Sequence, residues 1–159
     1  MNKQILKSTL IAAAGLLFAN SAMADTVETK FTVTATVLSS CNVAATDLAF
    51  GNYNPTTGDL DSTSTITTTC TAGTTYAIAL GQGDNTSRRM KSTGGEFLDY
   101  ELYQPGSYTA VWGDAGGATV AQTSTTGVPV DYTVNGRVTG GQYVTAGAYS
   151  DEVLVTVTY

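Results

Sequence analysis

The sequence predicts an all-β fold, a sandwich or a barrel, on three observations. Several short segments alternate apolar and polar residues, as strands with one buried face do. Breaks that contain Gly or Pro separate these segments, and no segment beyond residue 24 has the apolar spacing of a helix. Charged residues make up only 13% of the chain, and Thr, Gly and Ala are abundant. This composition is typical of an exported β-protein with many short strands and turns.

Residues 1–24 have the pattern of a secretory signal peptide. Lys3 and Lys7 provide the positive start, residues 10–19 are apolar, and residues 22–24 form a small-x-small cleavage site. The apolar run has about half of the ~20 residues that a membrane-spanning helix needs. We therefore predict export, a mature chain of 135 residues from Asp25, and no membrane insertion of that chain.

The mature chain begins with the most regular candidate strand, residues 27–37. Val27, Thr29, Phe31, Val33, Ala35 and Val37 share one face, and the other face is fully polar. The segment contains many β-branched residues and neither Gly nor Pro. Two interpretations remain open at this point. It is either the first strand of the chain's own sandwich or a strand offered to another molecule.

The next expected strands are shorter and separated by turns. We expect a hairpin of residues 62–71 with 76–80, and a strand that starts or lies at an edge around Pro129. In the last expected strand Val153, Val155, Val157 and Tyr159 share one face. The expected strands are residues 48–53, 62–71, 76–80, 97–103, 108–112, 128–138, 142–145 and 153–159. One domain without internal repeats accounts for all of them.

The two cysteines, Cys41 and Cys70, predict one disulfide, because an even count in an exported chain favours pairing. The closed loop of about thirty residues contributes roughly 3–4 kcal/mol on the chain-entropy model. Two buried free thiols are the alternative. A metal site is disfavoured because the chain has no His and no third Cys.

The charges and side chains argue against catalysis and against nucleic acid as a partner. Loss of the signal peptide removes two of seven basic residues and none of thirteen acidic ones, which leaves a net charge of −8. Such a surface repels nucleic acid and anionic membranes. Without His, neither a Ser-His-Asp nor a Cys-His pair can form. We expect no enzyme and no cofactor.

Several polar and aromatic residues have both a structural and a functional interpretation. The acid pairs Asp59/Asp61 and Asp99/Glu101 are expected to be solvated surface acids rather than glycosidase or Ca²⁺ groups. The basic cluster Arg88, Arg89 and Lys91 is expected on a wet strand face, with an acidic partner as the alternative. Four aromatic residues are candidates for stacking on sugars, although packing in the core is the simpler interpretation. They are Tyr100, Tyr103, Tyr108 and Trp112.

Three stretches together resemble the spore coat protein U domain, which includes the subunits of archaic (Csu-type) chaperone–usher pili. They are residues 31–37 before Cys41, residues 48–53, and residues 147–159. The resemblance covers essentially the whole mature chain. It implies an immunoglobulin-like β-sandwich that lacks its final strand.

The resemblance also implies a way of assembling. A periplasmic chaperone first fills the vacancy, the N-terminal strand of a neighbouring pilin subunit then replaces it, and an outer-membrane usher exports the homopolymer to the cell surface. Residues 25–38 would be the donor strand, with Val27, Thr29, Phe31, Val33, Ala35 and Val37 as its inserted face. Residues 39–159 would be the domain body, with Cys41–Cys70 as the structural disulfide. The acceptor groove would be bordered by Val153, Val155, Val157 and Tyr159.

The pattern agrees with this physically, because spare apolar strands at both ends of the given sequence are the two halves of a strand-addition interface. The expected function is a structural pilus subunit that supports attachment and biofilm. A rod subunit fits better than a two-domain tip adhesin, because the sequence shows no extra N-terminal domain. Two alternatives are a secreted monomeric surface protein and a small glycan-binding module.

Overall fold

The structure is a computed structural model that describes residues 24–159. The predicted signal peptide, apart from Ala24, lies outside these residues. The chain divides into two units, Met1–Ala35 and Thr36–Tyr159, which we describe separately. The second unit contains every strand found in residues 24–159 and is called the body.

The expected strand at residues 27–37 belongs to no sheet in the described chain. Residues 24–40 are neither helix nor strand, and every one of their side chains is exposed. Val27, Phe31 and Val33 have exposed fractions of 95%, 86% and 80%. A strand needs a neighbouring edge to pair its N–H and C=O groups. The segment therefore has the sequence of a strand without the partner that would make it one.

The body is all-β, as the sequence predicts, apart from one short 3₁₀ turn, η1. Its elements in chain order are β1 (Cys41–Ala45), β2 (Leu60–Cys70), β3 (Thr75–Leu80), β4 (Arg89–Ser92), β5 (Phe97–Asp99), β6 (Glu101–Tyr103), η1 (Gly116–Ala118), β7 (Val120–Thr123), β8 (Val130–Val138), β9 (Tyr149–Ser150) and β10 (Val155–Thr158).

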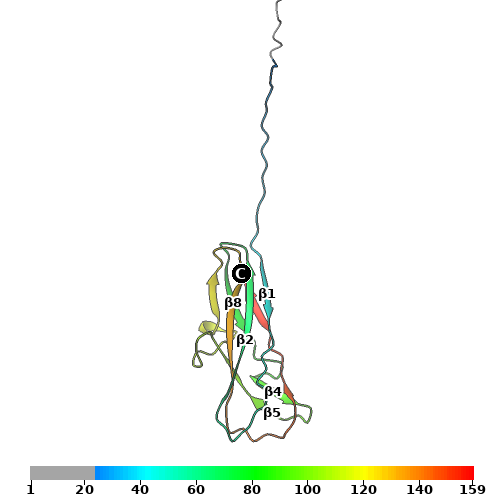
Figure 1. Cartoon of the computed structure of the whole chain (residues 1–159), viewed down its shortest axis with the longest axis vertical. Helices are drawn as coiled ribbons and strands as arrows, with labels where there is room; N and C mark the ends of the chain where they lie inside the picture. The colour runs from blue at the N-terminus through cyan, green and yellow to red at the C-terminus, as the bar shows by residue number, and fades with distance from the viewer. Residues whose placement is uncertain (1–23) are drawn as a thin grey trace, which may run out of the picture. The chain divides into compact units, whose positions relative to one another are not determined.

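The strands of the body form three antiparallel sheets, ordered β1-β2-β8-β6, β10-β3-β7 and β5-β4-β9. The longest pairing joins β2 to β8, with Leu60 opposite Val138 and Thr68 opposite Val130. Figure 1 shows β1, β2 and β8 side by side. β1 and β10 are the edge strands of their two sheets, and they lie close to each other.

The core explains why the expected hairpin of β2 with β3 does not form. Ile66 and Cys70 of β2 and Ile78 and Leu80 of β3 are all buried in one cluster. Two strands bury their apolar faces against each other when they lie in facing sheets, which pairing side by side cannot achieve. The connection at residues 71–74 therefore crosses between sheets.

Four other expectations about strands are wrong in detail. Residues 48–53 and 142–145 form no strand, and residues 108–112 contribute only an isolated bridge from Val111 to Tyr103. Residues 97–103 are split at Tyr100 into β5 and β6, which belong to different sheets. Residues 48–50, 97–103 and 142–145 do alternate in burial, but the backbone lacks a continuous neighbour on which to pair. The short strands β1, β7 and β9 were not expected from the sequence.

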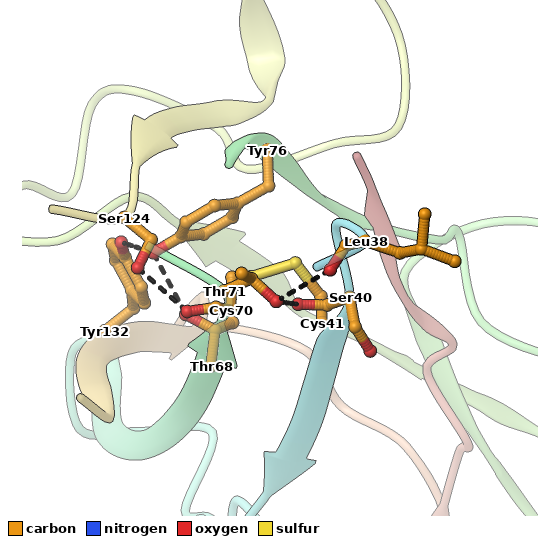
Figure 2. Close-up of a disulfide and its surroundings, with 9 residues drawn as sticks. All are labelled: Leu38, Ser40, Cys41, Thr68, Cys70, Thr71, Tyr76, Ser124 and Tyr132. Carbon is orange, nitrogen blue, oxygen red and sulfur yellow. Dashed lines mark hydrogen bonds between the residues drawn. A yellow bond between two sulfur atoms is a disulfide. The ribbon is translucent and has the colours of Figure 1, made fainter. Parts of the chain in front are cut away.

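The predicted disulfide is present and joins the first residue of β1 to the last residue of β2 (Figure 2). Cys41 lies directly opposite Cys70 in the ladder. Thr71 continues this pairing, since its N–H donates to Ser40 O at 2.8 Å and its Oγ1 to Leu38 O at 3.3 Å. The chain is thus attached to the body from Leu38 onward.

Candidate functional site

The body contains a groove with a volume of about 1170 Å³. Two chain segments flank it, residues 45–53 (the first wall) and residues 144–155 (the second wall). Core side chains form its floor, and they come from strands of all three sheets. The floor contains Ile66, Leu80, Leu98, Leu102, Val134 and Val138.

The first wall follows β1 but is attached to the sheet mainly through single hydrogen bonds. Its Thr46 N–H donates to Thr65 O at 3.0 Å, and Ser62 Oγ donates to Ala49 O at 2.7 Å. Leu48 and Phe50 are half-buried, whereas the residues between and beside them are exposed. The first wall therefore has the alternating side chains of a strand without its ladder.

A glycine in β8 allows the first wall to lie close to the sheet. A Cβ atom at Gly136 would lie 2.7 Å from Leu48 Cδ1 and 3.0 Å from Phe50 Cζ, which is closer than carbon atoms pack. Gly136 itself pairs with Ser62 on one side and with Leu102 on the other. The missing side chain thus makes the space that Leu48 and Phe50 fill.

The second wall is held by the carboxylate of Asp151. This group accepts hydrogen bonds from Asp84 N–H at 3.1 Å, Asn85 Nδ2 at 2.9 Å and Tyr100 Oη at 2.7 Å. Burial, followed by the hydrogen bond to Asp151, raises the pKa of Tyr100, so the phenol stays protonated as a donor. A Cβ at Gly83 would collide with the Asp151 carboxylate, and Gly83 has a φ of +82°. The loop at residues 83–85 is thereby tied to the wall.

The backbone of the second wall has one open edge. Leu154 O accepts from Gly81 N–H at 2.9 Å and Glu152 O accepts from Asp84 N–H at 3.1 Å, both toward the β3 side. Because peptide groups alternate along an extended chain, those of Val153 and Val155 point the other way. In the described residues β10 is the edge of its sheet, so this side is available for pairing.

The groove exposes part of the hydrophobic core. Several apolar side chains that pack against the buried cluster are themselves only half-buried, and those that line the groove are Leu48, Phe50, Tyr53, Met90, Val144, Tyr149, Val153 and Val155. A single-domain core normally covers such side chains with a further strand. The body therefore presents an apolar slot bordered by an unpaired backbone edge.

The residues expected to border an acceptor groove fall into three positions. Val153 and Val155 line the groove. Val157 is half-buried against the core in β10, and Tyr159 is 58% exposed beyond the end of that strand. The sequence did not point to the first wall as a border, although the alternation of Leu48 and Phe50 was the available signal. The floor residues carried no such signal because they come from distant strands.

The residues of the expected donor face lie in the exposed segment before β1. Val27, Thr29, Phe31, Val33, Ala35 and Val37 are all exposed. Leu38, at the expected junction, is also exposed, with an exposed fraction of 76%. Apolar side chains of this number and exposure rarely remain uncovered in a working protein.

The sequence suggested that the basic cluster lies on a solvent-exposed strand face, but one of its three members is buried. Arg88 has an exposed fraction of 6%, and its Nη2 donates to Leu80 O at 3.0 Å and Trp112 O at 2.8 Å. Burial lowers the pKa of its guanidinium. Arg89 remains partly exposed and lies over the ring of Phe97, 4.1 Å from its centroid, with Lys91 at 5.7 Å from the same ring.

The aromatic candidates for sugar stacking are mostly used within the body. Trp112 is fully buried, and its Nε1 donates to Ile78 O at 2.9 Å. Tyr100 is buried as well, while Tyr103 and Tyr108 pack edge to face with centroids 5.7 Å apart. The indole of Trp112 is therefore not accessible for stacking on a sugar, which argues against the glycan-binding hypothesis.

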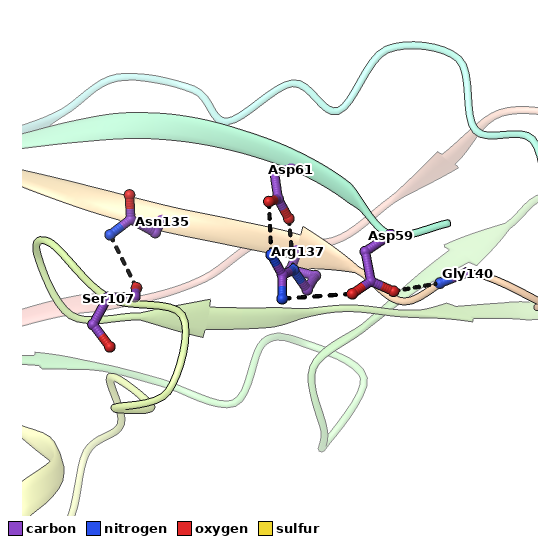
Figure 3. Close-up of polar contacts among 6 residues, drawn as sticks. All are labelled: Asp59, Asp61, Ser107, Asn135, Arg137 and Gly140. Atoms are coloured by element: carbon purple, nitrogen blue, oxygen red, sulfur yellow. Dashed lines mark hydrogen bonds and ion pairs between the residues drawn. The ribbon is translucent and has the colours of Figure 1, made fainter. Parts of the chain in front are cut away.

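The acid pair Asp59 and Asp61 is engaged by one arginine (Figure 3). Arg137 Nε and Nη2 donate to the two oxygens of Asp61 at 2.6 and 2.7 Å, and Nη1 lies 3.5 Å from Asp59. The hydrogen bonds from Arg137 lower the pKa of Asp61. Figure 3 also shows Asp59 accepting from the Gly140 N–H. The pair is thus a surface ion network and not a pair of free catalytic acids.

Two further searches of the described chain gave no site. Among residues 24–159, no cluster of three or more His, Cys, Asp or Glu side chains is placed to hold a metal ion. In the same residues no helix is long and apolar enough to cross a membrane.

Comparison with known proteins decides the family. The Spore Coat Protein U domain matches residues 27–156, from the exposed segment into β10. The chain belongs to the spore coat protein U domain family. The resemblance predicted from the sequence is therefore confirmed. The family domain includes the segment before β1 as well as the body.

Two relatives extend this assignment. Protein U of Myxococcus xanthus is 31% identical over an alignment of 172 positions, which covers 96% of each chain. A chain in the crystal structure of the CsuC–CsuE chaperone–tip adhesion subunit pre-assembly complex, from the archaic chaperone-usher Csu pili of Acinetobacter baumannii, is 27% identical with a TM-score of 0.57. That match covers 78% of the present chain and only 41% of the solved chain. The spore coat U fold is thus shared with a chain of a pilus assembly complex.

Proposed function

We propose that this protein is a structural subunit of an archaic chaperone–usher pilus, in which residues 25–38 of one copy fill the groove of the next copy. The observation that carries the proposal is the pairing of an open apolar groove with an exposed alternating segment in one chain. Membership of the spore coat U family and the likeness to the Csu complex support it. The proposed donor face is Val27, Thr29, Phe31, Val33, Ala35 and Val37.

The length and chemistry of the segment support its insertion into the groove. Eleven extended residues span about 36 Å, and the nine residues of the first wall, if extended, span about 30 Å. An inserted strand would pair its backbone with the open edge at Val153 and Val155 and turn its apolar face to the groove floor. Each large side chain buried there contributes roughly 1.5–3 kcal/mol. The summed free energy of burial exceeds that of a transient contact.

A strand passed from each copy to the next is a heterologous contact, and such contacts generate open filaments when the rotation does not close a ring. The proposal therefore predicts a homopolymer. The exposed groove of a single copy also requires a cover before assembly, and a periplasmic chaperone and an outer-membrane usher are the proposed partners. The proposed place of action is the cell surface, where such a fibre supports attachment and biofilm.

Deletion of residues 25–37 tests the proposal. The truncated chain should keep its groove and still be captured by the chaperone, but it should form no polymers by electron microscopy or sedimentation. A matched control replaces the outward Thr32 and Thr34 by Ser, which leaves the apolar face unchanged and should polymerise normally. Polymerisation of the truncated chain at the wild-type level would refute the proposal.

The alternative, a self-contained monomer, makes the opposite prediction for protease cleavage of residues 27–37. In a monomer that closes on itself, residues 27–37 are protected, so Lys30 resists trypsin. The exposed side chains of this segment favour the polymer instead. Rapid trypsin cleavage at Lys30 in monomers, together with protection in polymers, is the expected result.

A further inference from the structure

The rim of the groove has charge of one sign only. The groove is lined by three acidic residues, Asp47, Asp151 and Glu152, and by no Lys or Arg. The Asp151 carboxylate is already engaged by three donors. Asp47 and Glu152 are exposed, and neither forms an ion pair within the described part of the chain.

These two acids lie in the outer rows of opposite walls. Asp47 precedes the half-buried Leu48, and Glu152 precedes the half-buried Val153, so both carboxylates are on the solvent side of the alternation. A strand inserted between the walls would present its own outward side chains beside them.

Contacts between the two walls place the two acids within a few residues of each other along the groove. The ring of Phe50, on the first wall, has its centroid 6.2 Å from that of Tyr100, and Tyr100 Oη donates to Asp151 on the second wall. Asp47 is three residues from Phe50, or about 10 Å of extended chain, and Glu152 is next to Asp151. A strand inserted along this stretch therefore has one acid on each wall.

The proposed donor segment carries one complementary charge. Lys30 is the only basic residue among residues 24–40, and it lies on the polar face next to Phe31. Glu28 lies two positions away on the same face. The polar face therefore carries an acidic and a basic side chain two residues apart, which is the two-residue period of a strand.

We propose that Lys30 of one copy lies between Asp47 and Glu152 of the next copy and so fixes the register of the inserted strand. This inference rests on the proposed function. A slip of one residue is already excluded, because it turns the apolar face outward. A slip of two residues keeps the apolar face inward. The inward side chains then oppose such a slip only through their differences in size. One of the two-residue slips places Glu28 between two acids, which like-charge repulsion disfavours.

Charge exchange in the full mature chain tests this inference. Lys30→Glu should weaken polymerisation by about three- to tenfold, measured as the critical concentration in sedimentation at low salt. Adding Asp47→Lys and Glu152→Lys to Lys30→Glu should restore most of the loss. The difference between wild type and Lys30→Glu should shrink in ~0.5 M NaCl, where exposed charges are screened. All three positions are exposed, so the monomer melting temperature serves as a folding check.

The outcomes separate this inference from the function on which it rests. Val33→Asp places a charge on the proposed inserted face and should abolish polymers. If Val33→Asp polymerises normally, strand insertion itself is wrong. If Val33→Asp abolishes polymers while Lys30→Glu matches wild type, or if the exchanged acids give no rescue, insertion stands and the register role of Lys30 is refuted.

Discussion

Phe31 is the largest side chain of the proposed donor face, and its truncation gives the sharpest test of burial at the subunit junction. The side chain is 86% exposed in the isolated chain, so nearly all of its apolar surface is available to be buried on assembly. Full burial of a Phe side chain contributes roughly 1.5–3 kcal/mol. Since about 1.4 kcal/mol corresponds to a factor of ten, Phe31→Ala should raise the critical concentration about 10- to 150-fold.

Sedimentation velocity over a concentration series of the purified mature chain measures this change. Thr32→Ala is the matched control, because its side chain lies on the opposite face and should alter the critical concentration by less than about twofold. The melting temperature of the Phe31→Ala monomer should equal that of wild type. Equal effects of Phe31→Ala and Thr32→Ala, or a lower monomer melting temperature, would contradict burial of Phe31 in a neighbouring copy.

Three further predictions concern the body. Cys41→Ala with Cys70→Ala removes a cross-link between residues 29 apart and should cost about 3–4 kcal/mol, lowering the melting temperature by about 10–15 °C in calorimetry. Because Arg137 lowers the pKa of Asp61, this pair stabilises the fold fully above the ordinary carboxyl pKa of 3.8 and loses its effect as the pH falls through the lowered value. Asp61→Asn should therefore flatten the acid limb of a stability–pH curve, by under about 1 kcal/mol, as the pair is exposed. Trp112→Phe opens space in the core and removes a buried hydrogen bond, and should cost about 2–3 kcal/mol in urea unfolding.

Each of these predictions has a control within the same chain. Reduced wild-type protein should melt like the double cysteine variant, and a shift below about 3 °C in both would show that the cross-link does not limit the unfolded chain. Asp99→Asn removes an exposed carboxylate without an ion pair in the described residues, and should leave the acid limb unchanged. Tyr143→Phe alters a 78% exposed side chain and should not change unfolding. Equal costs for Tyr143→Phe and Trp112→Phe would refute the packing argument.

The strands that could be predicted are those whose two faces differ clearly. In β3 and β10, and in the second half of β2, the more and less buried positions alternate in step with the sequence pattern. Residues 48–53 alternate as well, yet they form no strand, because alternation reports on side-chain burial and not on the backbone partner that a ladder needs. The pattern there was correct about which side chains face the core and wrong about the secondary structure.

The position of Arg88 could not be predicted from its neighbours in the sequence. Its two hydrogen-bond acceptors, Leu80 O and Trp112 O, are backbone groups eight and 24 residues away, and they become available only when the strands have packed. Local sequence shows only a run of basic residues, for which solvent exposure is the usual outcome. The groove poses the same problem, because its floor combines side chains from strands that are distant in the chain.

The Cys41–Cys70 bond has a mechanical consequence if subunits are joined through residues 25–38. Tension along a fibre would enter each body at Cys41, the first residue of the edge strand β1. An edge strand pulled from its end peels away one backbone pair after another, which requires little force. Here the first pair of the β1 ladder is covalent, so once the hydrogen bonds from Thr71 to Leu38 and Ser40 give way, the load passes directly into β2, which lies between β1 and β8 in its sheet. Within each subunit the load would then be carried by a sulfur–sulfur bond and not by the short ladder of β1, and a reducing environment would make the body extensible under load.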